Sequence, residues 1–182
     1  NDLTARLNKL LENNSKATLT INNDVTLYND TEKAFKAILE GIITARHFVH
    51  LEYFSIFADE TGYTLQKLLI QKALEGVEVR FIYDDVGCWM LKKSFKQELR
   101  DAGVEFVPFM PVWIPFLNSR LNYRNHRKLV IVDGKKAYLG GMNIGDKYLG
   151  KKRYYGYWRD SLAEIEGKAV NALQAIFLAD WN

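Results

Sequence analysis

The chain has 182 residues, of which 48% are hydrophobic, and its formal net charge is +3. These values suit a single domain, 1–182, with a full hydrophobic core. The lone cysteine, Cys88, excludes an internal disulfide framework, and no apolar stretch reaches the ~18 residues that a membrane-spanning helix needs. Because the first residue is Asn1 rather than Met, we expect a domain excised from a longer protein.

The spacing of apolar residues predicts alternating helices and strands. Segment 1–16 has Leu3, Leu7 and Leu10 at helical spacing, and we expect an N-terminal helix and connector there. The alternation further along favours the α/β class, as a layered α-β-α sandwich with a central mixed sheet. Segment 145–156 is predicted to be a surface loop. Helices are predicted at 2–13, 31–46, 62–76, 92–102 and 168–181, and strands at 17–21, 25–28, 48–57, 77–83, 104–107, 129–132, 135–139 and 158–166.

All three prolines fall in one uncharged segment, 106–117, where they exclude a regular helix. This segment is either a buried loop or a loop that faces lipid, with Trp113 and Phe116 as candidate membrane contacts. It precedes a basic region, 118–159, with eleven Lys or Arg against two Asp. An apolar loop beside a cationic region favours an anionic phospholipid partner and makes nucleic acid a poor fit.

The most informative stretch begins just before strand 129–132, at His126 and Lys128. Side chains alternate along a strand, so this imidazole and this ammonium are predicted to point the same way. Asp133 has the opposite parity and lies in an Asp-Gly hairpin turn, which favours a structural role.

The return strand of the hairpin ends at Gly140 and Gly141, which allow close approach of the backbone. Asn143 follows and offers a neutral donor and acceptor. The pattern His-x-Lys, four residues, Asp, then Gly-Gly-x-Asn resembles the HKD motif of the phospholipase D superfamily. The residues flanking motif 126–143 are similar to the first catalytic half of bacterial cardiolipin synthase, and this resemblance runs from about Val25 to the end of the chain.

The resemblance implies that His126 attacks phosphorus and that a phosphohistidine intermediate forms. Lys128 would neutralise the phosphate oxygens, and Asn143 would add a hydrogen bond to the same group. Asp160, in Trp-Arg-Asp, is the candidate that orients the imidazole, by analogy with a carboxylate in the superfamily. The sequence contains no HExxH, Cys/His cluster or P-loop, so we expect no metal and no other cofactor.

Three further acids and one basic residue are considered for the site. A carboxylate inside strand 48–57 is costly unless it is paired, so Glu52 is a candidate for site support. Arg124, in the basic stretch before the motif, is a second candidate. Asp84 and Asp85 follow a predicted strand, and we favour a loop or helix-start role over a metal site because no third ligand is near in sequence.

One His-x-Lys pair cannot supply both the nucleophile and the acid for the leaving group, because the two lie on opposite sides of phosphorus. The superfamily pairs two motifs, within one chain or across a homodimer, so this chain would hold half of a site. The leading hypothesis is transfer of a phosphatidyl group between two phosphatidylglycerol molecules, giving cardiolipin. The full-length protein would act at the bacterial cell membrane, on the cytoplasmic face.

Two other classes of function stay open at this point. The same motif could serve a dimeric phosphodiesterase, endonuclease or phospholipase D. Alternatively, the chain could be an anionic-lipid binding half-domain that is inactive alone.

Overall fold

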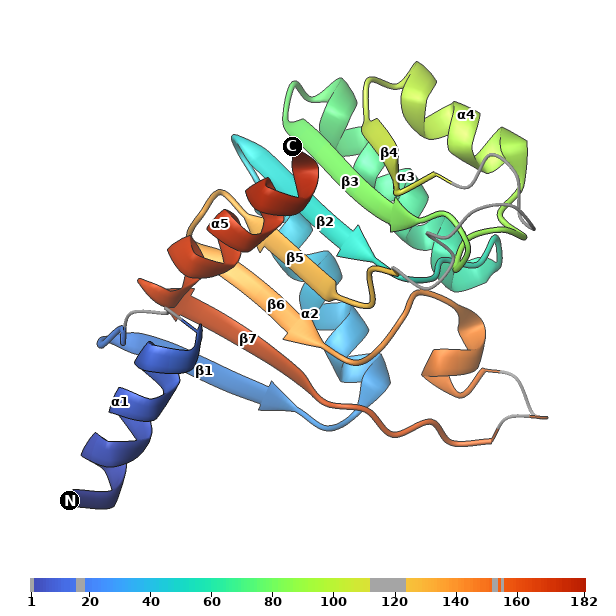
Figure 1. Ribbon diagram of the computed structural model, residues 1–182. Coiled ribbons are helices and arrows are strands. Elements are labelled where there is room, and N and C mark those ends of the chain that lie inside the picture. The colour runs from blue at the N-terminus through green and yellow to red at the C-terminus, as the bar shows by residue number, and fades with distance from the viewer. Residues whose placement is uncertain (1, 16–18, 112–123, 152–153, 155) are drawn as a thin grey trace.

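The computed structural model describes residues 2–15, 19–111, 124–151, 154 and 156–182. Its centre is a seven-stranded sheet in the order β1-β7-β6-β5-β2-β3-β4 (Figure 1). The neighbours β2–β3 and β3–β4 pair in parallel, whereas every other pair in the sheet is antiparallel. The strands are β1 (Asn23–Tyr28), β2 (Phe48–Tyr53), β3 (Glu78–Asp84), β4 (Glu105–Phe109), β5 (Lys128–Val132), β6 (Lys136–Gly140) and β7 (Leu162–Gly167).

Helices cover both faces of this mixed sheet, and the predicted layered α-β-α sandwich is confirmed (Figure 1). On one face, Val49 and Leu51 of β2 share a buried core with Ile38 of α2. On the other face, Ile131 of β5 packs with Phe177 of α5. The helices are α1 (Asp2–Ser15), α2 (Thr31–Ile43), α3 (Glu60–Leu74), α4 (Lys93–Asp101) and α5 (Ala169–Trp181), and residues of α2, α3 and α4 belong to the first core.

Helix α1 contributes little to either core. Its leucines at positions 3, 7, 10 and 11 are all more than half exposed. Across the described ranges, none of the helices has the length and apolar character to cross a bilayer.

One predicted strand is not found in the described residues, and two others are shorter than predicted. The strand expected at 17–21 is not formed by residues 19–21, and residues 16–18 lie outside the described part of the chain. β2 ends at Tyr53 rather than at position 57, because the chain leaves the sheet and Ile56 instead forms an isolated bridge with Ile144. β7 begins at Leu162 rather than at position 158. Apolar content alone does not mark where a chain turns away from its neighbouring strand.

The segment predicted as a surface loop, 145–156, contains a short buried helix instead, η2 (Asp146–Leu149). The Asp146 carboxylate accepts hydrogen bonds from the backbone N–H and the hydroxyl of Thr61, at 2.9 and 2.8 Å. The Asp146 N–H in turn donates to the Asp59 carboxylate, at 2.8 Å. The prediction was wrong for residues 145–149, because the Asp146 carboxylate pairs with the first turn of α3 instead of facing water. The described residues 150, 151, 154 and 156 are exposed, as predicted.

The contact between α2 and β6 gives a test of the packing. Gly41 in α2 lies against the buried Tyr138, and a Cβ at position 41 would sit 2.7 Å from two carbons of that ring. Alanine usually stabilises a helix by ~1 kcal/mol relative to glycine. Here we expect Gly41→Ala to lower the free energy of unfolding by ~1–3 kcal/mol, because the core is overpacked.

Urea unfolding followed by circular dichroism measures this change. Tyr138→Phe removes the hydroxyl that the new methyl group would meet, so it should recover part of the loss in the double variant. A Gly41→Ala protein as stable as the parent would contradict the packing described here.

Candidate active site

The β5–β6 hairpin carries the motif, and Asp133 ties its turn to the sheet. Asp133 and Gly134 have positive φ angles of 51° and 63°, as a tight hairpin turn requires. The Asp133 carboxylate accepts hydrogen bonds from the backbone N–H groups of Arg46, His47 and Phe48, at 3.0, 2.8 and 2.9 Å. Burial opposes its ionisation, but these hydrogen bonds hold the pKa of Asp133 below its ordinary value. The hairpin is thereby fixed to the start of β2.

His126 and Lys128, at the amino end of β5, both lie against Phe54. The His126 ring is exposed and stands 4.8 Å from the Phe54 ring, centroid to centroid. The Lys128 ammonium lies 5.4 Å from the centre of the same ring. It also donates a hydrogen bond to the backbone carbonyl of His126, at 2.6 Å. An open imidazole and an ammonium therefore share one aromatic support.

The Lys128 side chain is buried, with 3% of its residue surface exposed. Burial disfavours the charged form and lowers the pKa of Lys128 to about 8, although the negative charge of Asp160 acts in the opposite direction. The ammonium is therefore mostly charged at neutral pH but loses its proton far more readily than an exposed lysine.

Asp160 approaches the hairpin at Gly141. A Cβ at position 141 would lie 3.0 Å from one carboxylate oxygen of Asp160 and closer still to the other, so only glycine leaves room for this approach. One Asp160 oxygen accepts the N–H of Ser161 at 2.8 Å. Among the residues that the structure describes, no hydrogen bond joins Asp160 to the His126 ring. Orientation of His126 by Asp160 stays a prediction.

Asn143 is buried and joins segments on either side of the site. Its side-chain oxygen accepts the N–H of Ser55 at 3.1 Å, and its amide donates to the hydroxyl of Tyr148 at 3.3 Å. Ser55 directly follows Phe54, which supports both motif side chains. The amide is therefore held next to the aromatic support, without a described hydrogen bond to His126 or Lys128.

Glu52 does not lie with these groups, because its side chain points to the α5 face of the sheet. It is 1% exposed, accepts a hydrogen bond from the Asn125 amide, and lies 3.7 Å from the Arg127 guanidinium. Arg127 also pairs with Asp180 of α5. Burial first, and then the neighbouring Asp180, raise the pKa of Glu52 well above its ordinary value. Any support of the site by Glu52 acts through the residues flanking His126.

Arg124 pairs with the buried Asp84 at the carboxyl end of β3, at 3.6 Å. One oxygen of Asp84 accepts the N–H groups of Val86 and Gly87, as in the predicted loop role, and the other accepts the N–H of Asn125. Sequence reasoning missed this link, because nothing in the local pattern connects position 84 to the start of β5.

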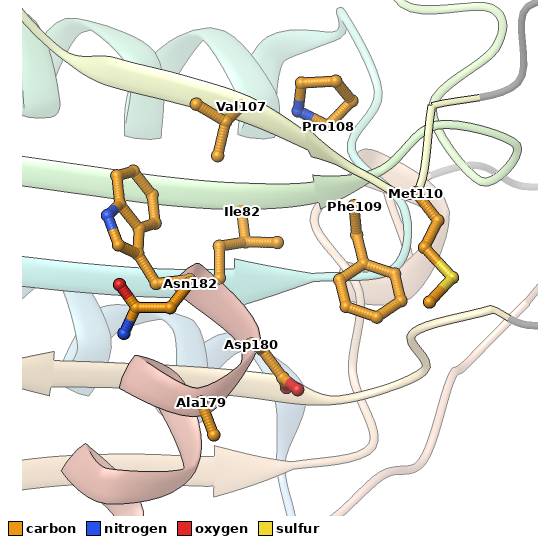
Figure 2. Close-up of a pocket in the computed structure, with 9 residues that line it drawn as sticks. Ile82, Val107, Pro108, Phe109, Met110, Ala179, Asp180 and Asn182 are labelled. Carbon is orange, nitrogen blue, oxygen red and sulfur yellow. The ribbon is translucent and has the colours of Figure 1, made fainter.

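On the α5 face, Asp180 lines a pocket of about 640 Å³ together with Phe109 and Met110 (Figure 2). The pocket also includes Ile82, which belongs to the core on the α5 side, so the sheet separates it from Lys128. Both predicted membrane contacts, Trp113 and Phe116, lie outside the described residues.

The fold and the position of the motif define a phospholipase D-type domain. A solved member of the phospholipase D family, Nuc from Salmonella typhimurium, shares the fold with a TM-score of 0.66 and 17% identity, over 88% of this chain and 95% of that one. The family model described as "Cardiolipin synthase, PLD-like domain" matches residues 38–181, and the chain belongs to this family. The resemblance noted in the sequence is confirmed.

Curated relatives agree with this assignment. The chain is 49% identical to cardiolipin synthase of Geobacillus sp. over 91% of its length, and 53% identical to cardiolipin synthase 2 of Bacillus anthracis over 86%. It spans about a third of each relative, 33% and 30%.

The role of Asp133 can be tested by its removal. Asp133→Ala leaves three backbone N–H groups without their acceptor, and we expect the free energy of unfolding to fall by ~2–3 kcal/mol at pH 7. Asp133→Asn keeps one acceptor oxygen, so its free energy of unfolding should lie between those of the parent and Asp133→Ala. Urea unfolding at several pH values provides the measurement.

The pH dependence has a defined sign. The folded pKa of Asp133 is lowered, so its contribution is full above the unfolded value of ~3.9 and is lost as pH falls through the folded value. The parent and Asp133→Asn should therefore converge in stability at acid pH. A constant difference between them would show that the charge of the carboxylate does not matter.

Proposed function

We propose that this chain is one catalytic half of a cardiolipin synthase, a phosphatidyltransferase that joins two phosphatidylglycerol molecules. The observation that carries the proposal is the pair of His126 and Lys128 on Phe54, an open imidazole beside a buried ammonium. The family assignment and two relatives near 50% identity support the same reaction.

In the first step a ring nitrogen of His126 attacks the phosphorus of one phosphatidylglycerol. A bond from nitrogen to phosphorus forms, and the bond from phosphorus to the glycerol oxygen breaks. Lys128 and the Asn143 amide stabilise the negative charge on the non-bridging oxygens. Asp160 holds the second ring nitrogen, which keeps the imidazole in the attacking orientation.

In the second step the hydroxyl of another phosphatidylglycerol attacks the phosphohistidine, and His126 leaves, giving cardiolipin. The leaving glycerol needs a proton, and the incoming hydroxyl must lose one. We assign both transfers to a second HKD half, supplied by the rest of a longer chain or by a homodimer partner. The chain alone would therefore hold the nucleophile without the opposite acid. The chain spans about a third of the length of each relative, which also favours a half-site.

The substrates place the proposed reaction at a membrane surface. The complete protein would work at the bacterial cell membrane, with the site open to the cytoplasmic face. The relatives are bacterial cardiolipin synthases, which supports a bacterial protein acting on membrane lipid.

The phosphohistidine can be trapped without the second half. Phosphatidyl-p-nitrophenol labelled with ³²P has a leaving group that departs without an acid, so the isolated chain should become labelled in an acid-labile, alkali-stable bond. His126→Ala should abolish the label, whereas His47→Ala, at an exposed histidine by the hairpin turn, should keep it. Label that persists without His126 would refute the proposal. Rapid labelling of the monomer by phosphatidylglycerol itself would refute the half-site.

The rate of this labelling should depend on pH through Lys128. Only the protonated amine stabilises the phosphate oxygens, so the rate should fall by about tenfold per pH unit above about 8, the pKa to which burial lowers Lys128. Lys128→Arg stays charged over this range and should remove the alkaline fall, at a lower overall rate. A parent profile that is flat to pH 10 would exclude a role for the ammonium charge.

A further inference from the structure

Two large apolar side chains project from the connection between β3 and α4. Trp89 is 61% exposed and Met90 is 89% exposed. They stand between Cys88 and Leu91, which are both buried in the main core. The connection thus presents an apolar tip on a base that is packed into the domain.

The base of this tip is well hydrogen-bonded. Asp84 accepts the N–H groups of Val86 and Gly87, at 3.0 and 2.8 Å. Backbone bonds from the N–H of Trp89 to the Val86 carbonyl and from Leu91 to Cys88 close two successive turns. Little conformational entropy remains to be lost when the tip binds, which favours a docking role over a mobile loop.

A hollow of about 180 Å³ lies beside the tip. Trp89 and Met90 form one side, and Ile56, Phe57 and Ala58 form another. The same segment carries Phe54, two positions before Ile56. The ring of Phe54 contacts the ring of His126. The carboxyl ends of β2 and β3 and the amino end of β5 meet at this edge of the sheet (Figure 1). The apolar tip and the imidazole therefore open at the same end of the molecule.

Basic side chains lie beside this apolar surface. Two acids follow the wall of the hollow in the chain, but Asp59 accepts the N–H groups of Gly62 and Asp146, and Glu60 pairs with Lys151 at 3.0 Å. Lys92 and Lys93 are exposed directly after the tip, and the Lys147 ammonium lies 4.4 Å over the ring of Phe57 in the wall of the hollow. Asp85, at the start of the connection, is the acid nearest the tip in the chain. An apolar tip with a cationic border is the pattern that binds an anionic lipid surface, because the apolar groups enter the acyl region while the cations meet the headgroups.

We infer that Trp89 and Met90 insert into an anionic phospholipid bilayer and bring the lipid phosphate to His126, with the hollow taking part of an acyl chain. The inference deepens the proposed function and rests on it for the identity of the lipid. It also names a membrane contact that the sequence did not indicate, in addition to the candidates Trp113 and Phe116.

Sedimentation of the 182-residue chain with vesicles tests this surface. Vesicles of equal parts phosphatidylglycerol and phosphatidylcholine should bind the chain more tightly than phosphatidylcholine alone. The double variant Trp89→Ala/Met90→Ala should partition into the anionic vesicles about tenfold less. The matched control is Leu74→Ala, which truncates a side chain 74% exposed at the opposite end of α3 and should change partitioning by less than about twofold.

The outcomes separate the possible partners. Undiminished binding of Trp89→Ala/Met90→Ala would overturn the inference. A second double variant, Trp113→Ala/Phe116→Ala, tests the other candidate contact, and a loss of binding in that variant alone would overturn the inference as well. Equal binding to both vesicle types would overturn the role of the lysines. Circular dichroism of each variant confirms that the fold is retained, as expected for exposed positions.

The test also stands apart from catalysis, because sedimentation needs no turnover. A chain that binds through Trp89 but forms no phosphohistidine would keep the inference and overturn the proposed function. The reverse result, labelling of His126 with no effect of the tip on vesicle binding, would overturn only the inference.

Discussion

The buried carboxylate of Asp84 joins the connection after β3 to the start of the motif. It has no exposed surface, and a buried carboxylate is costly unless its oxygens accept hydrogen bonds. Two of its bonds come from Val86 and Gly87, at the base of the apolar tip, and a third comes from the N–H of Asn125. Asn125 immediately precedes His126. One anion thus fixes both the tip and the start of the strand that carries the motif relative to β3.

The two faces of β5 divide the work between chemistry and positioning. One side carries Lys128, which lies over the ring of Phe54, and the exposed His126 imidazole contacts the same ring. On the other side, the Asn125 amide donates to Glu52, and Arg127 pairs with Asp180 of α5. The alternating side chains at the four positions 125–128 therefore lie on opposite faces of the sheet. His126 and Lys128 are placed where a substrate could reach the imidazole, while Asn125 and Arg127 hold the strand against α5.

Much of the fold could be predicted from the sequence, because the apolar periodicity of elements such as α2 and β5 reflects burial directly. The hairpin at Asp133 was equally accessible, since Asp-Gly between two apolar runs has few other structures available. What could not be predicted depends on long-range partners. Asp146 has the composition of a loop residue and is buried because Thr61 lies beside it, 85 positions earlier in the chain. Likewise, Glu52 was recognised as needing a partner, but only the structure places it on the α5 face.

The contact between the Lys128 ammonium and the His126 carbonyl has a consequence for the order of events in the proposed reaction. An ammonium has three N–H donors, and this bond uses one of them while it restrains the end of a long side chain. Two donors remain for an anion. In the proposed transfer, the lysine would therefore lose little side-chain entropy when a phosphate group arrives, because the protein has already fixed its position.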